Sequence, residues 1–171
     1  RRIKIIPFEE HHISEEYLSW FNDEDVIEFS GGKSKNLSKD DVLNYIKYGK
    51  ETGTYFMYAI IHLEDNIHIG NIKIGDIDIK NSISDLATII GNTKYWGMGL
   101  ATESIILAQD YAFKKYKFRK LSGRIIKSNI GSFKAYTKAG WEVEGILKDH
   151  IIVNGKIDDV YLVSKFNKIY S

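Results

Sequence analysis

The stretch from Ile89 to Glu103, which reads IIGNTKYWGMGLATE, decides the fold of this chain. An apolar run typical of a β-strand enters a glycine-rich turn, and a helix with a regular apolar pattern follows. The first turn of a helix presents unpaired backbone N–H groups and a partial positive charge. Glycine lets such a backbone approach a ligand closely. The stretch therefore predicts a cradle for an anion, and phosphate is the anion that such turns typically bind.

The composition is that of one ordinary globular domain over residues 1–171, with 43% hydrophobic and 27% charged residues. A net charge of +1 is too balanced to favour nucleic acid or an anionic membrane as the partner. The absence of cysteine excludes a disulfide framework, a thiolate metal site and a cysteine nucleophile. No apolar run approaches the roughly 20 residues of a membrane span. We expect a cytoplasmic protein with no metal, no nucleic-acid partner and no membrane partner.

Hydrophobic periodicity predicts an α/β fold with a mixed sheet and helices on both faces. Strands are expected at about residues 2–6, 55–62, 68–79, 85–90, 121–126, 141–147 and 160–166. Helices are expected at about residues 14–21, 38–50, 100–116 and 132–139. Asn154-Gly155 predicts a hairpin turn between the last two strands.

The glycine turn can be compared with a dinucleotide fingerprint, with a P-loop and with a plain turn that binds nothing. A dinucleotide fingerprint needs a third glycine, which Thr102 replaces, and an acid about 20 residues on, where residues 117–120 read KFRK. A P-loop needs Gly-Lys-Ser/Thr after its second glycine, which is absent. A plain strand-to-helix turn without a ligand needs nothing more than the glycines.

A second motif follows the fifth expected strand. Residues 129–141 read NIGSFKAYTKAGW, in which an asparagine opens a helix and a tyrosine follows about two turns later. The two segments together resemble the GNAT superfamily of acetyl-CoA-dependent N-acetyltransferases. Lys94, Gly97 and Gly99 occupy the positions of the family pattern R/Q-x-x-G-x-G/A, with lysine where arginine or glutamine is usual. The pattern N-x-x-S/A-x-x-x-Y-x-K-x-G-F is matched by Asn129, Ser132, Tyr136, Lys138, Gly140 and Trp141.

The segment YWGMGLATE resembles the sequences of one branch of that superfamily, the RimJ/RimL-like branch. This branch includes ribosomal-protein, polyamine and amino-sugar acetyltransferases. The resemblance implies a seven-stranded, mostly antiparallel sheet whose fourth and fifth strands splay apart. It also implies acetyl-CoA as co-substrate, with pyrophosphate on the backbone of residues 95–101 and Lys94 nearby. The residues expected to bind the coenzyme are Ile89, Ile90, Gly91, Lys94, Tyr95, Trp96, Gly97, Met98, Gly99, Leu100, Ala101, Thr102, Asn129, Ser132 and Phe133.

The chemistry expected is direct attack of an amine on a thioester, because no cysteine can carry an acyl group. Tyr136 fits the acid that protonates the leaving thiolate, since a phenol with a pKa near ~10 stays protonated at pH 7. The alternative to a catalytic role is that Tyr136 only packs on the sheet. Asp85 is the leading base, although a carboxylate at a strand start is also typically just solvated. This branch often has glutamate there, and a shorter side chain reaches less far.

The acceptor is expected to enter between the loop at residues 28–34 and the segment at residues 148–159. The residues expected to line it are Phe29, Gly31, Lys148, His150 and Asp159. The leading hypothesis for the acceptor is an amino-sugar nucleotide, followed by the N-terminal amine of a ribosomal or other protein and then by a polyamine. A non-catalytic acyl-CoA-binding domain is the rival from another class. A homodimer is compatible with the sequence.

Overall fold

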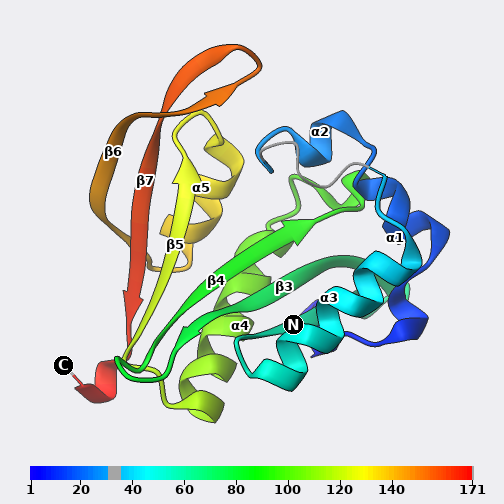
Figure 1. The fold of residues 1–171 in the computed structure, drawn as a ribbon, viewed down its shortest axis with the longest axis horizontal. Helices are drawn as coiled ribbons and strands as arrows, with labels where there is room; N and C mark the ends of the chain where they lie inside the picture. Colours follow the sequence, from blue (N-terminus) through cyan, green and yellow to red (C-terminus); the bar gives the residue numbers. More distant parts are fainter. Residues whose placement is uncertain (31–35, 171) are drawn as a thin grey trace.

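The computed structural model describes residues 1–30 and 36–170, so that the predicted site residue Gly31 lies outside the described residues. The described residues form one seven-stranded sheet in the order β1-β2-β3-β4-β5-β7-β6 (Figure 1). The strands are β1 (Ile3–Pro7), β2 (Tyr55–His62), β3 (Ile67–Asp78), β4 (Ile83–Ile90), β5 (Lys120–Ile126), β6 (Glu142–Val153) and β7 (Lys156–Phe166). The helices are α1 (Glu15–Trp20), α2 (Glu24–Ile27), α3 (Lys39–Thr52), α4 (Leu100–Tyr116) and α5 (Ile130–Lys138), with short 3-10 turns η1 (Glu10–His12), η2 (Thr93–Tyr95) and η3 (Lys168–Tyr170).

The sheet divides between β4 and β5. These two strands are parallel, and they pair only where Ile83–Asp85 faces Lys120–Ser122. From Leu86 onward β4 keeps β3 on one side and pairs with no strand on the other among the described residues. Figure 1 shows the two strands diverging from a common start, with β5, β7 and β6 on one arm. The predicted mixed sheet and the splay between the fourth and fifth strands are confirmed.

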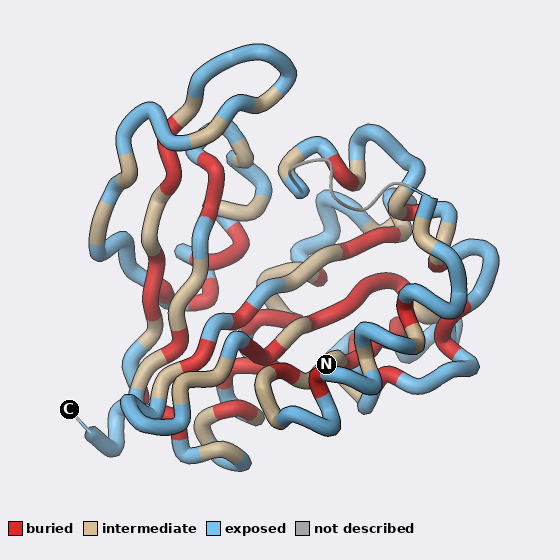
Figure 2. The backbone as a smooth tube through the Cα atoms, viewed as in Figure 1, coloured by how far each residue is buried: buried red, intermediate tan, exposed pale blue. Residues whose placement is uncertain are grey.

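Helices cover both faces of the sheet, as the periodicity predicts. Helices α4 and α5 pack on one face, over a core that includes Ile60, Ile72 and Leu86. Helices α1 and α3 cover the other face of the first strands, over Ala59 and Ile61. Figure 2 shows buried residues concentrated along the strands, whereas the tip of the β6–β7 hairpin is exposed. Among the described helices, none is long and apolar enough to cross a membrane.

The expected helix starts are present with their caps. The Ser14 hydroxyl accepts the backbone N–H of Tyr17 at 3.0 Å at the start of α1. Ser38 and Asp41 form a reciprocal capping box at the start of α3. Gly140, with φ of 82°, follows the end of α5 in the left-handed conformation that is common just after a helix.

Two expectations were wrong. Strands β6 and β7 extend to the Asn154-Gly155 turn, so the segment at residues 148–159 is a hairpin and His150 lies within β6. The pairing shifts between Leu147 and Ile151, and Asp149 has a positive φ of 50°. Such a bulge lets the strand resume after an interruption that looks like its end. Helix α2 was missed because a single turn capped by Asp23 is too short to show a period.

Histidine side chains are buried between η1 and the sheet. His12 is 6% exposed, and its ring lies 5.3 Å from those of Phe8 and His68. Its Nδ1 accepts the backbone N–H of Glu9 at 2.9 Å. Burial lowers the pKa of His12 from 6.5 to about 4, and the charges of His11 and His68 act in the same direction. Burial also lowers the pKa of His68. Both rings are therefore neutral in the folded protein at neutral pH.

We predict that acid destabilises this protein through His12. As the pH falls below 6.5 the unfolded chain binds a proton at this histidine, whereas the folded chain does so only near pH 4. The free energy of unfolding should therefore fall by up to about 3 kcal/mol between pH 7 and pH 4. Urea unfolding at several pH values measures this loss.

The variant His12→Asn keeps a hydrogen-bond acceptor without a titrating group, and it should show a smaller loss. His68 accounts for the part that remains. His11→Asn is the matched control, because His11 is adjacent in the chain and exposed. An identical pH dependence in His12→Asn and the wild type would contradict the prediction.

Candidate active site

The glycine turn has the geometry expected of an anion cradle. Gly97 and Gly99 have φ of 74° and 77°, values that side chains with a Cβ rarely adopt. Gly99 is the N-cap of α4, and no side chain caps that helix. The first backbone N–H groups of a 17-residue helix therefore stay available to a ligand. A Cβ at Gly97 would meet no atom within 4 Å, so its backbone conformation, and not space, requires glycine.

Arg2 ties the turn to strand β1. Its Nη1 donates to the Met98 carbonyl at 2.7 Å, and its Nε donates to the Glu103 carboxylate at 3.0 Å. The backbone N–H of Arg2 also donates to Glu103 at 2.7 Å. Arg2 is a residue that sequence reasoning missed, because nothing local in the sequence signals a partner 101 positions away.

The end of β4 and the turn η2 are anchored by aromatic side chains. The Trp96 indole donates to the Ile90 carbonyl at 2.7 Å, and the Tyr95 hydroxyl donates to Asp65 at 2.6 Å. The backbone N–H of Lys94 donates to the Asn92 side chain at 3.2 Å, and Lys94 is exposed. Two of the predicted coenzyme residues thus fix the turn, while Lys94 presents its side chain to solvent.

Trp20 packs directly on Gly91. A Cβ at Gly91 would overlap the indole ring, which is itself buried against the rings of Tyr17 and His68. The backbone N–H of Gly91 donates to the Ile69 carbonyl at 2.9 Å. The close approach of α1 therefore requires glycine at the point where β4 enters the turn.

Tyr136 lies at the first position where β4 and β5 part. Its side chain is 5% exposed, and its hydroxyl donates to the Leu86 carbonyl at 2.9 Å, one residue beyond the last β4–β5 pair. Its ring meets that of Trp141 edge-on at 4.9 Å. Burial raises the pKa of Tyr136, and nearby Thr88 opposes that shift. Tyr136 is both a packed tyrosine and a protonated hydroxyl at the free edge of β4.

Asp85 is the last β4 residue that pairs with β5, and it is exposed. Successive side chains of a strand point to opposite faces, so Asp85 lies on the face opposite buried Leu86. Partial burial and the charge of Asp76 raise the pKa of Asp85, against the effect of Arg124 and Lys73. The two predicted catalytic residues therefore lie at the same short segment of β4: Asp85 belongs to it, and Tyr136 binds the carbonyl of the next residue, Leu86.

The predicted residues of α5 form its start. The Asn129 side chain accepts the backbone N–H of Ser132 at 3.1 Å, as a helix cap does. The Phe133 ring packs 5.1 Å from that of Tyr161 on β7. Their position after β5 places them on the arm of the sheet opposite β4.

The predicted acceptor residues come together only in part. Asn154 at the hairpin turn donates to Glu28 at 3.1 Å, which brings the end of α2 against β6–β7. A hollow of about 370 Å³ lies there, lined by Glu28, Ser128, Val153, Asn154, Lys156, Ile157 and Asp158. None of the four predicted acceptor residues that the structure describes lines it, although Phe29 and Asp159 adjoin it in the chain.

Asp159 and Lys148 form an ion pair of 3.1 Å instead of facing that hollow separately. Lys127 also pairs with Asp159, at 3.2 Å, and the backbone N–H of Asp149 donates to it at 3.0 Å. The Asp149 N–H, followed by Lys148, lowers the pKa of Asp159 to about 2. His150, in the same bulge, is exposed.

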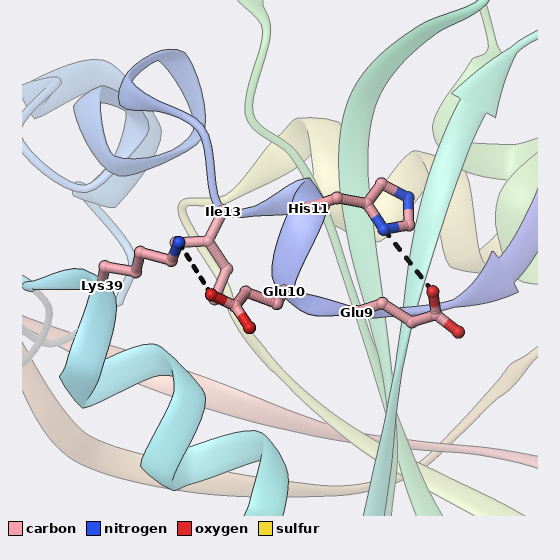
Figure 3. Close-up of a pocket in the computed structure, with 5 residues that line it drawn as sticks. All are labelled: Glu9, Glu10, His11, Ile13 and Lys39. Carbon is pink, nitrogen blue, oxygen red and sulfur yellow. Dashed lines mark ion pairs between the residues drawn. The ribbon is translucent and has the colours of Figure 1, made fainter.

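A larger hollow of about 520 Å³ lies elsewhere, beside η1 and α3 (Figure 3). Lys39 pairs with Glu10 at 2.9 Å and His11 with Glu9 at 3.5 Å across it. None of the predicted site residues within 1–30 and 36–170 lines it. Over residues 1–30 and 36–170, no three or more histidine and carboxylate side chains gather in a way that could hold a metal ion.

Comparison with known proteins gives a consistent family. Residues 2–142 match the family described as acetyltransferase (GNAT) domain. An uncharacterized N-acetyltransferase of Bacillus licheniformis is 26% identical over 114 residues, which cover 67% of this chain and 64% of that protein. Spermidine N(1)-acetyltransferase of Escherichia coli is 34% identical over 106 residues, covering 62% and 56%. The chain thus matches less than two thirds of the length of these relatives.

One solved structure matches almost the whole fold. Spermidine N-acetyltransferase of Vibrio cholerae, in complex with CoA and spermine, has a TM-score of 0.87. Its sequence is 17% identical, and the match covers 99% of this chain and 98% of that one. This similarity establishes the shared architecture.

We predict that Gly91→Ala destabilises the protein, because the new methyl group overlaps the buried Trp20 ring. Overpacking of this kind typically costs about 1–3 kcal/mol, which should lower the melting temperature by several degrees. Gly131→Ala is the matched control, since a Cβ there meets only the Asn129 side chain at 3.9 Å. Thermal unfolding measures both. Equal stability of Gly91→Ala and the wild type would show that the indole ring moves freely.

Proposed function

The chain belongs to the GNAT acetyltransferase family, and on this premise we propose that it transfers an acetyl group from acetyl-CoA to a primary amine. The observation that carries the proposal is the buried Tyr136 hydroxyl at the first unpaired residue of β4. A strand edge that no other strand covers presents backbone donors and acceptors, which suit the amides of an extended ligand.

The residues of the chain fit acetyl-CoA as co-substrate. The uncapped start of α4, which follows two glycines in the left-handed region, would hold the pyrophosphate. The free edge of β4 from Leu86 to Ile90 would hold the pantetheine arm, next to α5 and its first residues Asn129, Ser132 and Phe133. The buried Thr88 hydroxyl on this edge has no hydrogen-bond partner among the described residues, so it is available to the groups that react there.

Tyr136 would act as the general acid. Burial keeps its phenol protonated, so that it holds a proton to donate to the leaving sulfur. Asp85 would accept a proton from the acceptor amine, directly or through water. Its raised pKa makes it a better proton acceptor than an ordinary aspartate, and its exposed position lets it reach a solvated ammonium group.

The acceptor would enter opposite the coenzyme, near the hollow between α2 and the β6–β7 hairpin. A polyamine gains support from the relatives named as spermidine acetyltransferases and from two carboxylates, Glu28 and Asp158, in the lining. Lys156 in the same lining favours an anionic acceptor such as the amino-sugar nucleotide expected from the sequence. Phe29, Lys148, His150 and Asp159 stay proposals as lining residues. The RimJ/RimL-like branch, the single domain, the cytoplasmic location and a homodimer stay proposals as well.

We predict acetyl-CoA-dependent thiol release with at least one acceptor in a panel of polyamines, amino-sugar nucleotides and N-terminal peptides. Tyr136→Phe should lower kcat by about 10²–10³-fold, because the general acid is lost, with little change in CoA affinity. A thiol-release assay measures kcat, and calorimetric titration with CoA measures the affinity. Unchanged turnover of Tyr136→Phe would remove its role as the acid.

The non-catalytic rival gives a different result. An acyl-CoA-binding domain would be stabilised by CoA, by about 2.7 kcal/mol at a hundredfold excess over Kd, but would transfer no acetyl group to any amine. Stabilisation by NADH and not by CoA would contradict both the acetyltransferase and the acyl-CoA-binding domain, because each requires that the glycine turn bind CoA.

We also predict that Arg2→Ala weakens CoA binding several-fold, because the Met98 carbonyl and Glu103 then lose the group that holds the turn. Arg1→Ala is the control, since Arg1 is the exposed neighbour of the same charge. Calorimetric titration with CoA compares the two variants. Equal affinities would show that the turn keeps its conformation without Arg2.

A further inference from the structure

Thr88 carries an unexplained buried hydroxyl next to the proposed general acid. Its Oγ1 is buried and makes no hydrogen bond with any described group, one of two such side-chain atoms found, the other being Ser164 Oγ. A buried polar group without a partner destabilises a fold, so such a group calls for a functional reason. Valine has nearly the same shape and would fill this site without that loss.

The position of Thr88 connects it with Tyr136. Thr88 lies two residues beyond Leu86 on the free edge of β4, and side chains at this spacing point to the same face. The Tyr136 hydroxyl donates its proton to the Leu86 carbonyl, which leaves the lone pairs of the phenolic oxygen available. Thr88 also opposes the rise that burial causes in the pKa of Tyr136.

We propose that Thr88 is a positioning residue whose hydroxyl donates a hydrogen bond to the Tyr136 oxygen when acetyl transfer turns this phenol into a phenolate. This inference rests on the proposed function. In the reaction the acceptor nitrogen, after one of its protons has passed to Asp85, forms a bond to the acetyl carbon, the carbon–sulfur bond breaks, and the phenolic proton of Tyr136 passes to the sulfur. The Thr88 hydroxyl then stabilises the negative oxygen until the second proton, which the acceptor nitrogen loses after forming the new bond, restores the phenol.

The test compares Thr88→Val with Thr88→Ser. Thr88→Val should raise the melting temperature by about 2–4 °C, because it removes an unpartnered buried hydroxyl, while kcat falls about tenfold and the KM for acetyl-CoA stays within twofold. Thr88→Ser keeps the hydroxyl and should retain most of the wild-type kcat. Ser164→Ala is the matched control: it removes the other unpartnered hydroxyl, two strands away on β7, and should leave kcat unchanged.

A double-mutant cycle separates positioning from packing. In the Tyr136→Phe background Thr88→Val should have no further effect on kcat, because the oxygen that it serves is gone. An equal tenfold loss in both backgrounds, or a wild-type kcat in Thr88→Val, would overturn the role of Thr88 and leave the proposed function intact. A wild-type protein that acetylates no amine would overturn the proposed function and this inference together.

Discussion

The short pairing of β4 with β5 is the constraint on which the rest of this structure depends. Three residue pairs join the two arms of the sheet, and then the strands part. Beyond that point the backbone of β4 must find other partners, because buried N–H and C=O groups are costly to leave unpaired. Tyr136 supplies the first of these with its hydroxyl, and it comes from α5 on the other arm. The packing of α5 on α4, together with the 2.8 Å hydrogen bond that the Trp141 indole, just after α5, donates to Gln109 of α4, therefore determines where the phenol lies.

The glycine turn depends on contacts from the beginning of the chain. Trp20 presses on Gly91 from one side, and Arg2 binds the Met98 carbonyl on the other. These contacts hold a turn whose two later glycines have backbone conformations that favour glycine alone. A rigid turn is what an anion cradle needs, since each backbone N–H must already point at its ligand when the ligand arrives. Trp20 of α1 and Arg2, just before β1, thus support a site that is formed by β4 and α4.

The hairpin of β6 and β7 shows how a strand can change the surface beside a site. Its bulge takes Lys148 and His150 out of the regular ladder. Asp159 pairs with Lys127 and Lys148 and accepts the backbone N–H of Asp149. These contacts stabilise its charge and connect β7 with β6 and with the end of β5. Asp159, which the sequence predicted to line the acceptor site, is therefore largely paired within the protein. Glu28 and Asp158, on neighbouring elements, stand at the hollow instead.

The sequence by itself determined the seven strands in chain order, the helices α1, α3, α4 and α5, and the strand–turn–helix around Gly97 and Gly99. These features depend on periodicity and on local backbone preferences, which a few neighbouring residues set. Its resemblance to a known family supplied the splay of the sheet and the choice of Tyr136. Only the tertiary structure decided that Arg2 holds the turn, that Trp20 requires Gly91, and that Thr88 lies unpartnered beside Tyr136. Each of these joins residues far apart in the chain, and their contacts depend on how helices and strands pack, which no local pattern records.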